Sequence, residues 1–251
     1  MDHLLTVQYG NKWRIRGIAV GREQMLCDRR ALVFGTAMLL ICEHSPLLAG
    51  SSNSTAISHL RDFLLSTVGK PEIERETIAR RTLDQITPLA VPTLLVEIAA
   101  IGTLVRSNST SSSLREGYPR RSREALDMAE QKLGDEGWTK ALGGAWHYEV
   151  VRRSRIGAMV YGASRQKGDT LFGEAIKLEP DDPGIRLTEV VALLGTKDDA
   201  AAKRASSILN DLPTRGTTPY TQLVAAQTVQ LSQLLRAGRV DDAHARSLTI
   251  F

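Results

Sequence analysis

The fold class is decided by one stretch, Leu171-Phe172-Gly173-Glu174-Ala175-Ile176-Lys177-Leu178-Glu179-Pro180. Leu171, Phe172, Ala175 and Leu178 lie at i, i+1, i+4 and i+7, so their side chains share one face of a helix. Pro180 ends this helix because proline lacks a backbone N–H and restricts the residue before it. A comparable proline, Pro213, follows 33 residues later. The stretch therefore predicts a helix that belongs to a recurring unit.

The rest of the chain after residue 50 has the same helical spacing, and no run alternates as a half-buried strand would. Residues 51–55 and the Ser-rich residues 107–113 predict a linker and a flexible loop. Helices are predicted over 56–68, 71–87, 93–106, 122–133, 145–164, 165–178, 183–194, 199–212, 219–237 and 240–251. The predicted fold class is all-α, built from stacked antiparallel helix pairs.

The segment around Phe172 resembles a tetratricopeptide repeat, and the best copy spans residues 145–180. Ala125 and Ala243 occupy the small-residue position in further copies, although the spacing between copies is irregular. The resemblance covers residues 119–251 at most. The residues that match its pattern, and that we expect to pack the repeats, are Gly168, Phe172, Ala175, Pro180 and Ala201.

The resemblance implies a superhelical array whose concave side is a binding surface. We therefore expect a non-enzymatic adaptor or scaffold that binds a protein, a peptide or a small acidic ligand, without a cofactor. The formal net charge of +4 is small for 251 residues, so nucleic acid is not an expected partner.

The N-terminal residues 1–49 read as an extension followed by a secretory signal. Arg29-Arg30 precede the apolar run 31–42, and small residues follow near a cut after Ala49. Translation from Met25 would give this signal a conventional start. Both cysteines, Cys27 and Cys42, would be removed with it. We expect an exported, extracytoplasmic protein (periplasmic in a bacterium) with no stable membrane insertion after cleavage.

Two alternatives for the apolar run stay open. It could be a buried core helix, or an uncleaved anchor of a membrane-tethered scaffold, although it is shorter than the about 20 residues of a spanning helix. The chain then divides into residues 1–49, a helical part with the Ser-rich loop at 50–114, and the repeat region at 115–251.

The richest polar cluster of the sequence, residues 146–155, is a candidate binding surface. Its arginines could pair with carboxylates or phosphate, and its aromatic rings could stack on a ligand. The competing interpretation is a solvated helix face with an ion pair between Glu149 and Arg153. The candidate binding residues are Trp146, Tyr148, Arg152, Arg153 and Arg155.

No catalytic or metal-binding motif is present in the sequence. An enzyme that uses His147 as acid or base is the alternative, with Glu97 or Glu189 as its carboxylate partner. The acidic pairs at 181–182 and 198–199 are expected to cap helices rather than to do chemistry.

Overall fold

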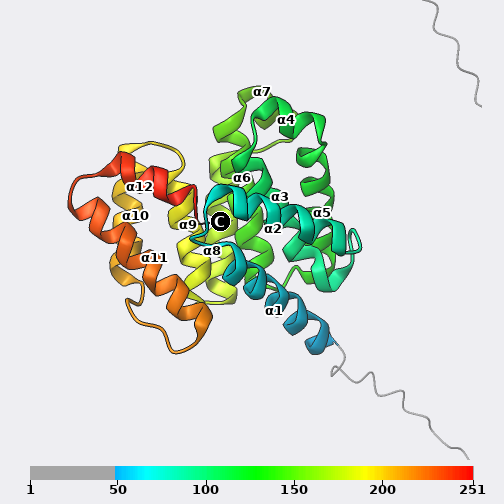
Figure 1. Cartoon of the computed structure of the whole chain (residues 1–251), viewed down its shortest axis with the longest axis horizontal. Coiled ribbons are helices and arrows are strands. Elements are labelled where there is room, and N and C mark those ends of the chain that lie inside the picture. The colour runs from blue at the N-terminus through cyan, green and yellow to red at the C-terminus, as the bar shows by residue number, and fades with distance from the viewer. Residues whose placement is uncertain (1–48, 251) are drawn as a thin grey trace, which may run out of the picture. The chain divides into compact units, whose positions relative to one another are not determined.

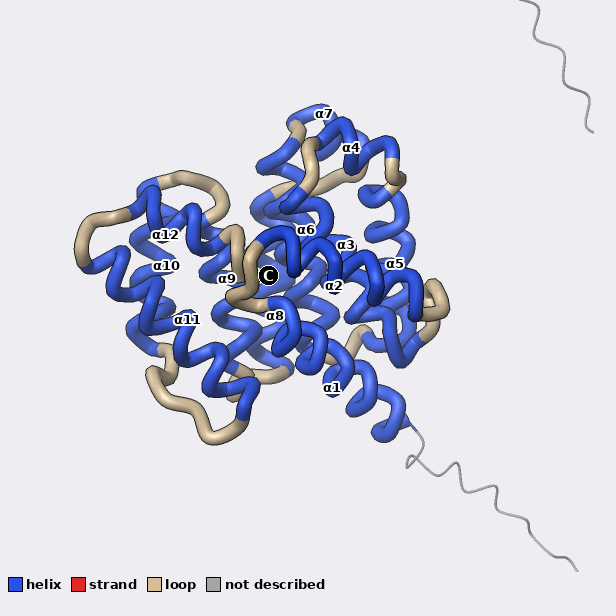
Figure 2. The backbone as a smooth tube through the Cα atoms, viewed as in Figure 1, coloured by secondary structure: helices blue, strands red, loops and turns tan. Residues whose placement is uncertain are grey.

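The structure, a computed structural model, describes residues 49–250 (Figures 1 and 2). The predicted signal sequence lies outside these residues, apart from Ala49. The described part is all-α, as predicted: it holds twelve α-helices and one 3-10 turn, and no strand. They are α1 (Ala49–Thr67), α2 (Glu72–Gln85), η2 (Val91–Thr93), α3 (Leu94–Ser107), α4 (Thr110–Arg115), α5 (Tyr118–Leu133), α6 (Gly137–Arg153), α7 (Arg155–Val160), α8 (Arg165–Leu178), α9 (Pro183–Leu194), α10 (Asp199–Asp211), α11 (Pro219–Arg236) and α12 (Val240–Ser247).

Two apolar helices, α3 and α9, lie at the centre of the packing. Helix α3 contacts α1, α2, α5 and α6, and α9 contacts α6, α8, α10, α11 and α12. Most side chains of both helices are buried, which agrees with the apolar sequence of 93–106. One core therefore joins residues before and after position 114. The regular superhelical stacking of a tetratricopeptide array stays a prediction.

The most extensive contact between two helices is that of α6 with α8. Gly137 lies beside Ala175, whereas Gly144 lies beside Gly168 and Phe172, so the two helices run antiparallel. A Cβ on Gly144 would lie 3.0 Å from the Phe172 ring and 3.1 Å from the Gly168 carbonyl oxygen. Glycines on both helices thus let the backbones approach, and Phe172 and Ala175 are fully buried in the contact.

Pro180 and Ala201, the other two residues expected to pack the repeats, are not buried in the contact between α6 and α8. Pro180 is exposed between α8 and α9, after α8 has ended at Leu178. Ala201 is half-buried at the edge of α10, where Ala202 and Ala205 take the buried positions.

The predicted helix over 145–164 is wrong at both ends. Helix α6 begins at Gly137, because Gly143 and Gly144 are needed inside it for the contact with α8. It ends at Arg153, because Ser154 is extended at φ −156° and ψ 118° and accepts a hydrogen bond from the Gly157 N–H at 2.9 Å. Ser154 thereby caps a separate short helix, α7.

Two segments predicted to be irregular are helical. Ser109 accepts a hydrogen bond from the Ser112 N–H and caps α4 inside the expected Ser-rich loop. Helix α1 begins at Ala49, so residues 51–55 are not a linker. At the other end, α12 stops at Ser247, before the predicted limit. None of the helices described is both long enough and apolar enough to cross a lipid bilayer.

Candidate functional site

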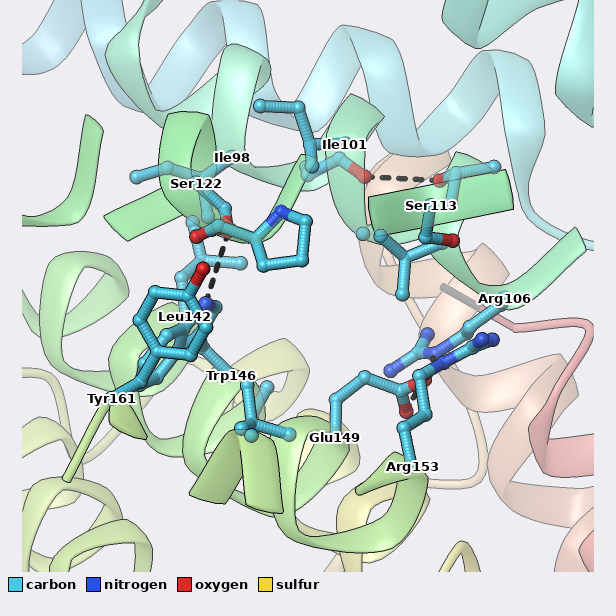
Figure 3. Close-up of a pocket in the computed structure, with 18 of the residues that line it drawn as sticks. Ile98, Ile101, Arg106, Ser113, Ser122, Leu142, Trp146, Glu149, Arg153 and Tyr161 are labelled. Carbon is cyan, nitrogen blue, oxygen red and sulfur yellow. Dashed lines mark hydrogen bonds and ion pairs between the residues drawn. The ribbon is translucent and has the colours of Figure 1, made fainter. Parts of the chain in front are cut away.

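A cavity of about 330 Å³ lies between α3, α5 and α6 and reaches the short helices α4 and α7 (Figure 3). Its wall is mainly aliphatic and aromatic. The apolar residues of the wall include Phe63, Leu64, Ile98, Ile101, Leu142, Trp146, Val150 and Tyr161. This combination of size and apolar lining is typical of a small-molecule site.

Gly102 of α3 forms part of the cavity wall. A Cβ built on Gly102 would meet no atom within 4 Å, so the helix faces open space at this position. A glycine in a helix interior destabilises it by about 0.5–1 kcal/mol relative to alanine. Here the glycine widens the cavity instead of allowing two helices to pack.

One end of the cavity is cationic. Glu149 of α6 accepts hydrogen bonds from Arg153 Nε at 2.5 Å and from Arg152 Nη2 at 2.5 Å, and Arg106 Nε of α3 lies 3.8 Å from its Oε2. Arg106, Arg153 and Glu149 all line the cavity. Arg106 and Arg153 thus bring two guanidinium groups to this end of the cavity, whereas Arg152 binds the same carboxylate from outside the lining.

The charges at this end are held in place by the fold. The side chains of Arg106, Arg153 and Glu149 are 12%, 14% and 15% exposed. Burial by itself would raise the pKa of Glu149, but the attraction of Arg106 and the hydrogen bonds from Arg152 and Arg153 outweigh it and lower the pKa to about 2. Glu149 is therefore a carboxylate at every physiological pH.

The other end of the cavity is aromatic. Figure 3 shows Leu142, Trp146 and Tyr161 there, opposite the group of Arg106, Glu149 and Arg153. Trp146 is held by a hydrogen bond from its Nε1 to Ser122 Oγ at 3.0 Å, and Tyr161 packs edge-on to it with a centroid distance of 6.2 Å. Ser113 also lines the cavity, and its buried Oγ has no partner within the described residues.

The predicted binding residues separate into two groups. Trp146 and Arg153 line the cavity, while Tyr148 and Arg152 lie outside its lining, around the α6 face near α9. Tyr148 is buried and donates a hydrogen bond to Asp169 Oδ1 at 2.8 Å. Arg155 is exposed on α7 and does not line the cavity. The five residues are thus not one surface.

Helix α3 supplies the part of the site that the sequence analysis missed. Gly102 and Arg106 come from α3, and Glu149 was considered only as the ion-pair partner of Arg153. One signal could have pointed to them: α3 is apolar nearly all round, yet it carries a glycine in its middle and an arginine one turn later.

His147 lies on another side of α6, in a more polar hollow of about 840 Å³ that Arg123, Glu130 and Lys167 also line. His147 is buried, and its Nδ1 has no partner within the described part. Burial, together with the nearby positive charges of Arg123 and Lys167, lowers the pKa of His147 to about 4.

The two carboxylates proposed as partners for His147 are engaged elsewhere. Glu97 is paired with Arg121 at 2.7 Å and accepts the Leu89 N–H, and Glu189 is paired with Arg204. Neither of them lines the hollow that His147 lines. Within residues 49–250, no three His, Cys, Asp or Glu side chains lie close enough together to hold a metal ion.

Comparison of the chain with protein-family models, with curated proteins and with solved structures gave no match. The resemblance to tetratricopeptide repeats therefore stays a prediction that rests on the residues quoted for it. What the cavity can bind follows from its own shape and charges.

Proposed function

We propose that this protein is a non-enzymatic binding protein whose cavity takes a small amphipathic molecule with an acidic head group. One observation carries the proposal: a predominantly apolar cavity ends at Arg106 and Arg153. The apolar body of the ligand would be buried against α3 and α6, and its carboxylate would accept hydrogen bonds from the guanidinium groups.

The charge balance supports an acidic head group rather than a neutral one. Charges that are removed from water are stable only when they are paired. Arg106, Arg153 and Glu149 line this end, so a ligand carboxylate would meet two cationic side chains and one anionic side chain there. The unpartnered hydroxyl of Ser113, in the same wall, adds a hydrogen-bonding group.

The volume of the cavity sets the size of the part of the ligand that the protein can enclose. At about 30 Å³ for each non-hydrogen atom, taken as the volume of a water molecule, a cavity of about 330 Å³ encloses roughly ten such atoms. A medium-chain carboxylic acid has this size. A longer chain would extend through the opening beside α4 and α7.

The sequence left a protein, a peptide or a small acidic ligand open, and the cavity supports the last of these. We keep export to an extracytoplasmic compartment as part of the proposal, on the evidence of the apolar run 31–42 and its flanks. N-terminal sequencing of the purified protein tests export, since cleavage would give a chain that starts near Gly50, whereas a tethered scaffold would retain the run.

The binding proposal is tested by calorimetric titration with decanoate and, as a neutral ligand of equal length, 1-decanol. Gly102→Phe should fill the cavity and abolish the binding of both ligands. Gly173→Phe is the matched control, because a Cβ at Gly173 also meets nothing within 4 Å but lies at an exposed position of α8, away from the cavity. Equal decanoate affinity in both variants would refute the site.

The head-group assignment has its own test. Arg153→Gln should weaken decanoate binding by about 10- to 100-fold, since hydrogen bonds to charged groups are worth about 1.5–3 kcal/mol, and it should leave 1-decanol binding nearly unchanged. Arg152→Gln is the control: Arg152 also contacts Glu149 but does not line the cavity. If both variants weaken decanoate equally, Arg153 does not contact the head group.

A further inference from the structure

The opening of the cavity is surrounded by exposed apolar side chains. We name Leu114 of α4 with Ile156, Met159 and Val160 of α7 the α4–α7 lip; these residues are 57%, 72%, 77% and 69% exposed. Leu114, Ile156 and Val160 also line the cavity. Side chains that both line a cavity and face solvent must stand at its opening.

The two helices of the lip border the same cavity. Figure 1 shows α4 and α7 together at the top of the view, and both contribute residues to the same cavity wall. Each is only six residues long, and each begins at a serine cap, Ser109 or Ser154. The lip is therefore a small apolar patch on two short helices.

The surroundings of the lip are basic. Residues 106–120 and 152–160 contain six arginines and one carboxylate, Glu116. Four of these arginines form ion pairs with carboxylates outside the two segments: Arg106, Arg152 and Arg153 with Glu149, and Arg120 with Glu124. Arg115 and Arg155 are exposed at the ends of the two lip helices, and neither forms an ion pair with any residue that the structure describes. Two exposed arginines without an ion pair, one on each lip helix, are complementary to an anionic surface.

A lipid bilayer fits this patch better than a protein does. A standard protein interface uses roughly 20–30 residues on each side, whereas the lip has four apolar side chains on two short helices. Apolar side chains that enter the boundary between head groups and acyl chains, with arginines at the lipid phosphates, are typical of peripheral attachment to anionic membranes.

We propose that the α4–α7 lip docks on the surface of an anionic lipid bilayer, so that the amphipathic ligand passes between the bilayer and the cavity through the opening. This inference rests on the proposed function, because the cavity supplies the reason for an opening that faces lipid. The bilayer is contacted and not crossed.

The test is co-sedimentation with vesicles of phosphatidylcholine, with and without phosphatidylglycerol. The wild-type protein should bind only the vesicles that contain phosphatidylglycerol, and should do so less at high salt. The variant Arg155→Glu/Met159→Glu should bind at least 10-fold more weakly. Neither residue lines the cavity, so decanoate titration of this variant should match the wild type.

The matched control is Ile73→Glu/Arg81→Glu on α2, which makes the same change of charge on another helix. Ile73 is 71% exposed and Arg81 is exposed, so the control substitutions should disturb folding as little as those in the lip. The control should bind anionic vesicles like the wild type. Equal loss in both variants would mean that net charge alone drives binding, and would overturn the lip as the docking site.

Two further results would also overturn the docking proposal. One is a wild-type protein that binds decanoate but no anionic vesicles, which would leave the proposed function standing. The other is a dimer in size-exclusion chromatography that Arg155→Glu/Met159→Glu converts to a monomer, which would assign the lip to contact between two copies. Loss of decanoate binding in the wild type would instead remove the proposed function itself.

Discussion

At the scale of single residues, His147 has an environment that strongly disfavours its charged form. Its ring is buried on α6, its Nδ1 is unpartnered within the described part, and its pKa falls to about 4 because burial and two nearby cations disfavour the charged form. The ring is therefore neutral at pH 7, and its protonation opposes folding.

The pH dependence of stability follows from this shift. In the unfolded chain the pKa of histidine is about 6.5, so below that pH the unfolded state binds a proton that the folded state excludes until about pH 4. The stability present above pH 6.5 is lost as the pH falls toward 4. Between pH 7.5 and pH 5 the wild type should lose on the order of 2 kcal/mol through His147.

Urea unfolding of the wild type and of His147→Gln at both pH values measures this difference. The variant should lose about 2 kcal/mol less than the wild type, because glutamine does not titrate. Carboxylates that titrate in the same pH range change the free energy of unfolding of both proteins equally, so their contribution cancels in the difference. Parallel pH profiles for the two proteins would show that His147 is solvated and titrates normally.

At the scale of the helices, the contact between α6 and α8 depends on glycine. A Cβ on Gly168 would lie 2.7 Å from Tyr148 Cδ2, a ring that is itself held by Asp169. We expect Gly168→Ala to destabilise the protein by about 1–3 kcal/mol through overpacking. Gly173→Ala, in the same helix but with nothing within 4 Å, should stabilise it by up to about 1 kcal/mol.

Thermal or urea unfolding of the two alanine variants separates packing from helix propensity. If Gly168→Ala stabilised the protein as Gly173→Ala does, the two helices would lie farther apart than described.

At the scale of the whole molecule, Asp182 joins four helices. It caps α9 by accepting the Gly184 N–H at 2.8 Å, and it accepts hydrogen bonds from Arg61 of α1 at 2.7 Å, Trp138 of α6 at 2.9 Å and Tyr220 of α11 at 2.9 Å. Asp182 is 8% exposed. Its carboxylate therefore links segments from one end of the described chain to the other.

We expect Asp182→Ala to lower the free energy of unfolding by about 3–5 kcal/mol, because it leaves a cation and two buried donors without their acceptor. Asp198→Ala is the control. Asp198 caps α10 from an exposed position and accepts only backbone N–H groups as hydrogen bonds, so its loss should cost about 0.5–2 kcal/mol. Equal losses of unfolding free energy in the two variants would show that Asp182 contributes no more than an ordinary helix cap.

Much of the local structure could be predicted from the sequence. The all-α class, the buried character of α3 and the caps Asp182 and Asp198 were predicted, because periodicity and capping depend on residues within one or two turns. The predictions were wrong where a tertiary contact or a single side chain overrode the local pattern, as at Gly143-Gly144 inside α6, and at Ser109 and Ser154, which begin short helices.

The candidate site could be predicted only in part. Trp146 and Arg153 were recognised as candidates because they lie in one polar, aromatic run, and both line the cavity. Tyr148, Arg152 and Arg155 belong to the same run but point elsewhere, since successive residues of a helix project in different directions.

The amino-acid sequence by itself determined the helical class, most helix positions and the capping residues, since each depends on neighbours along the chain. Only the tertiary structure decided that Gly102 and Arg106 of α3 meet Glu149 and Arg153 of α6 around one cavity. Those residues lie more than 40 positions apart, and the packing of α3 against α6, which brings them together, has no local signature in either segment.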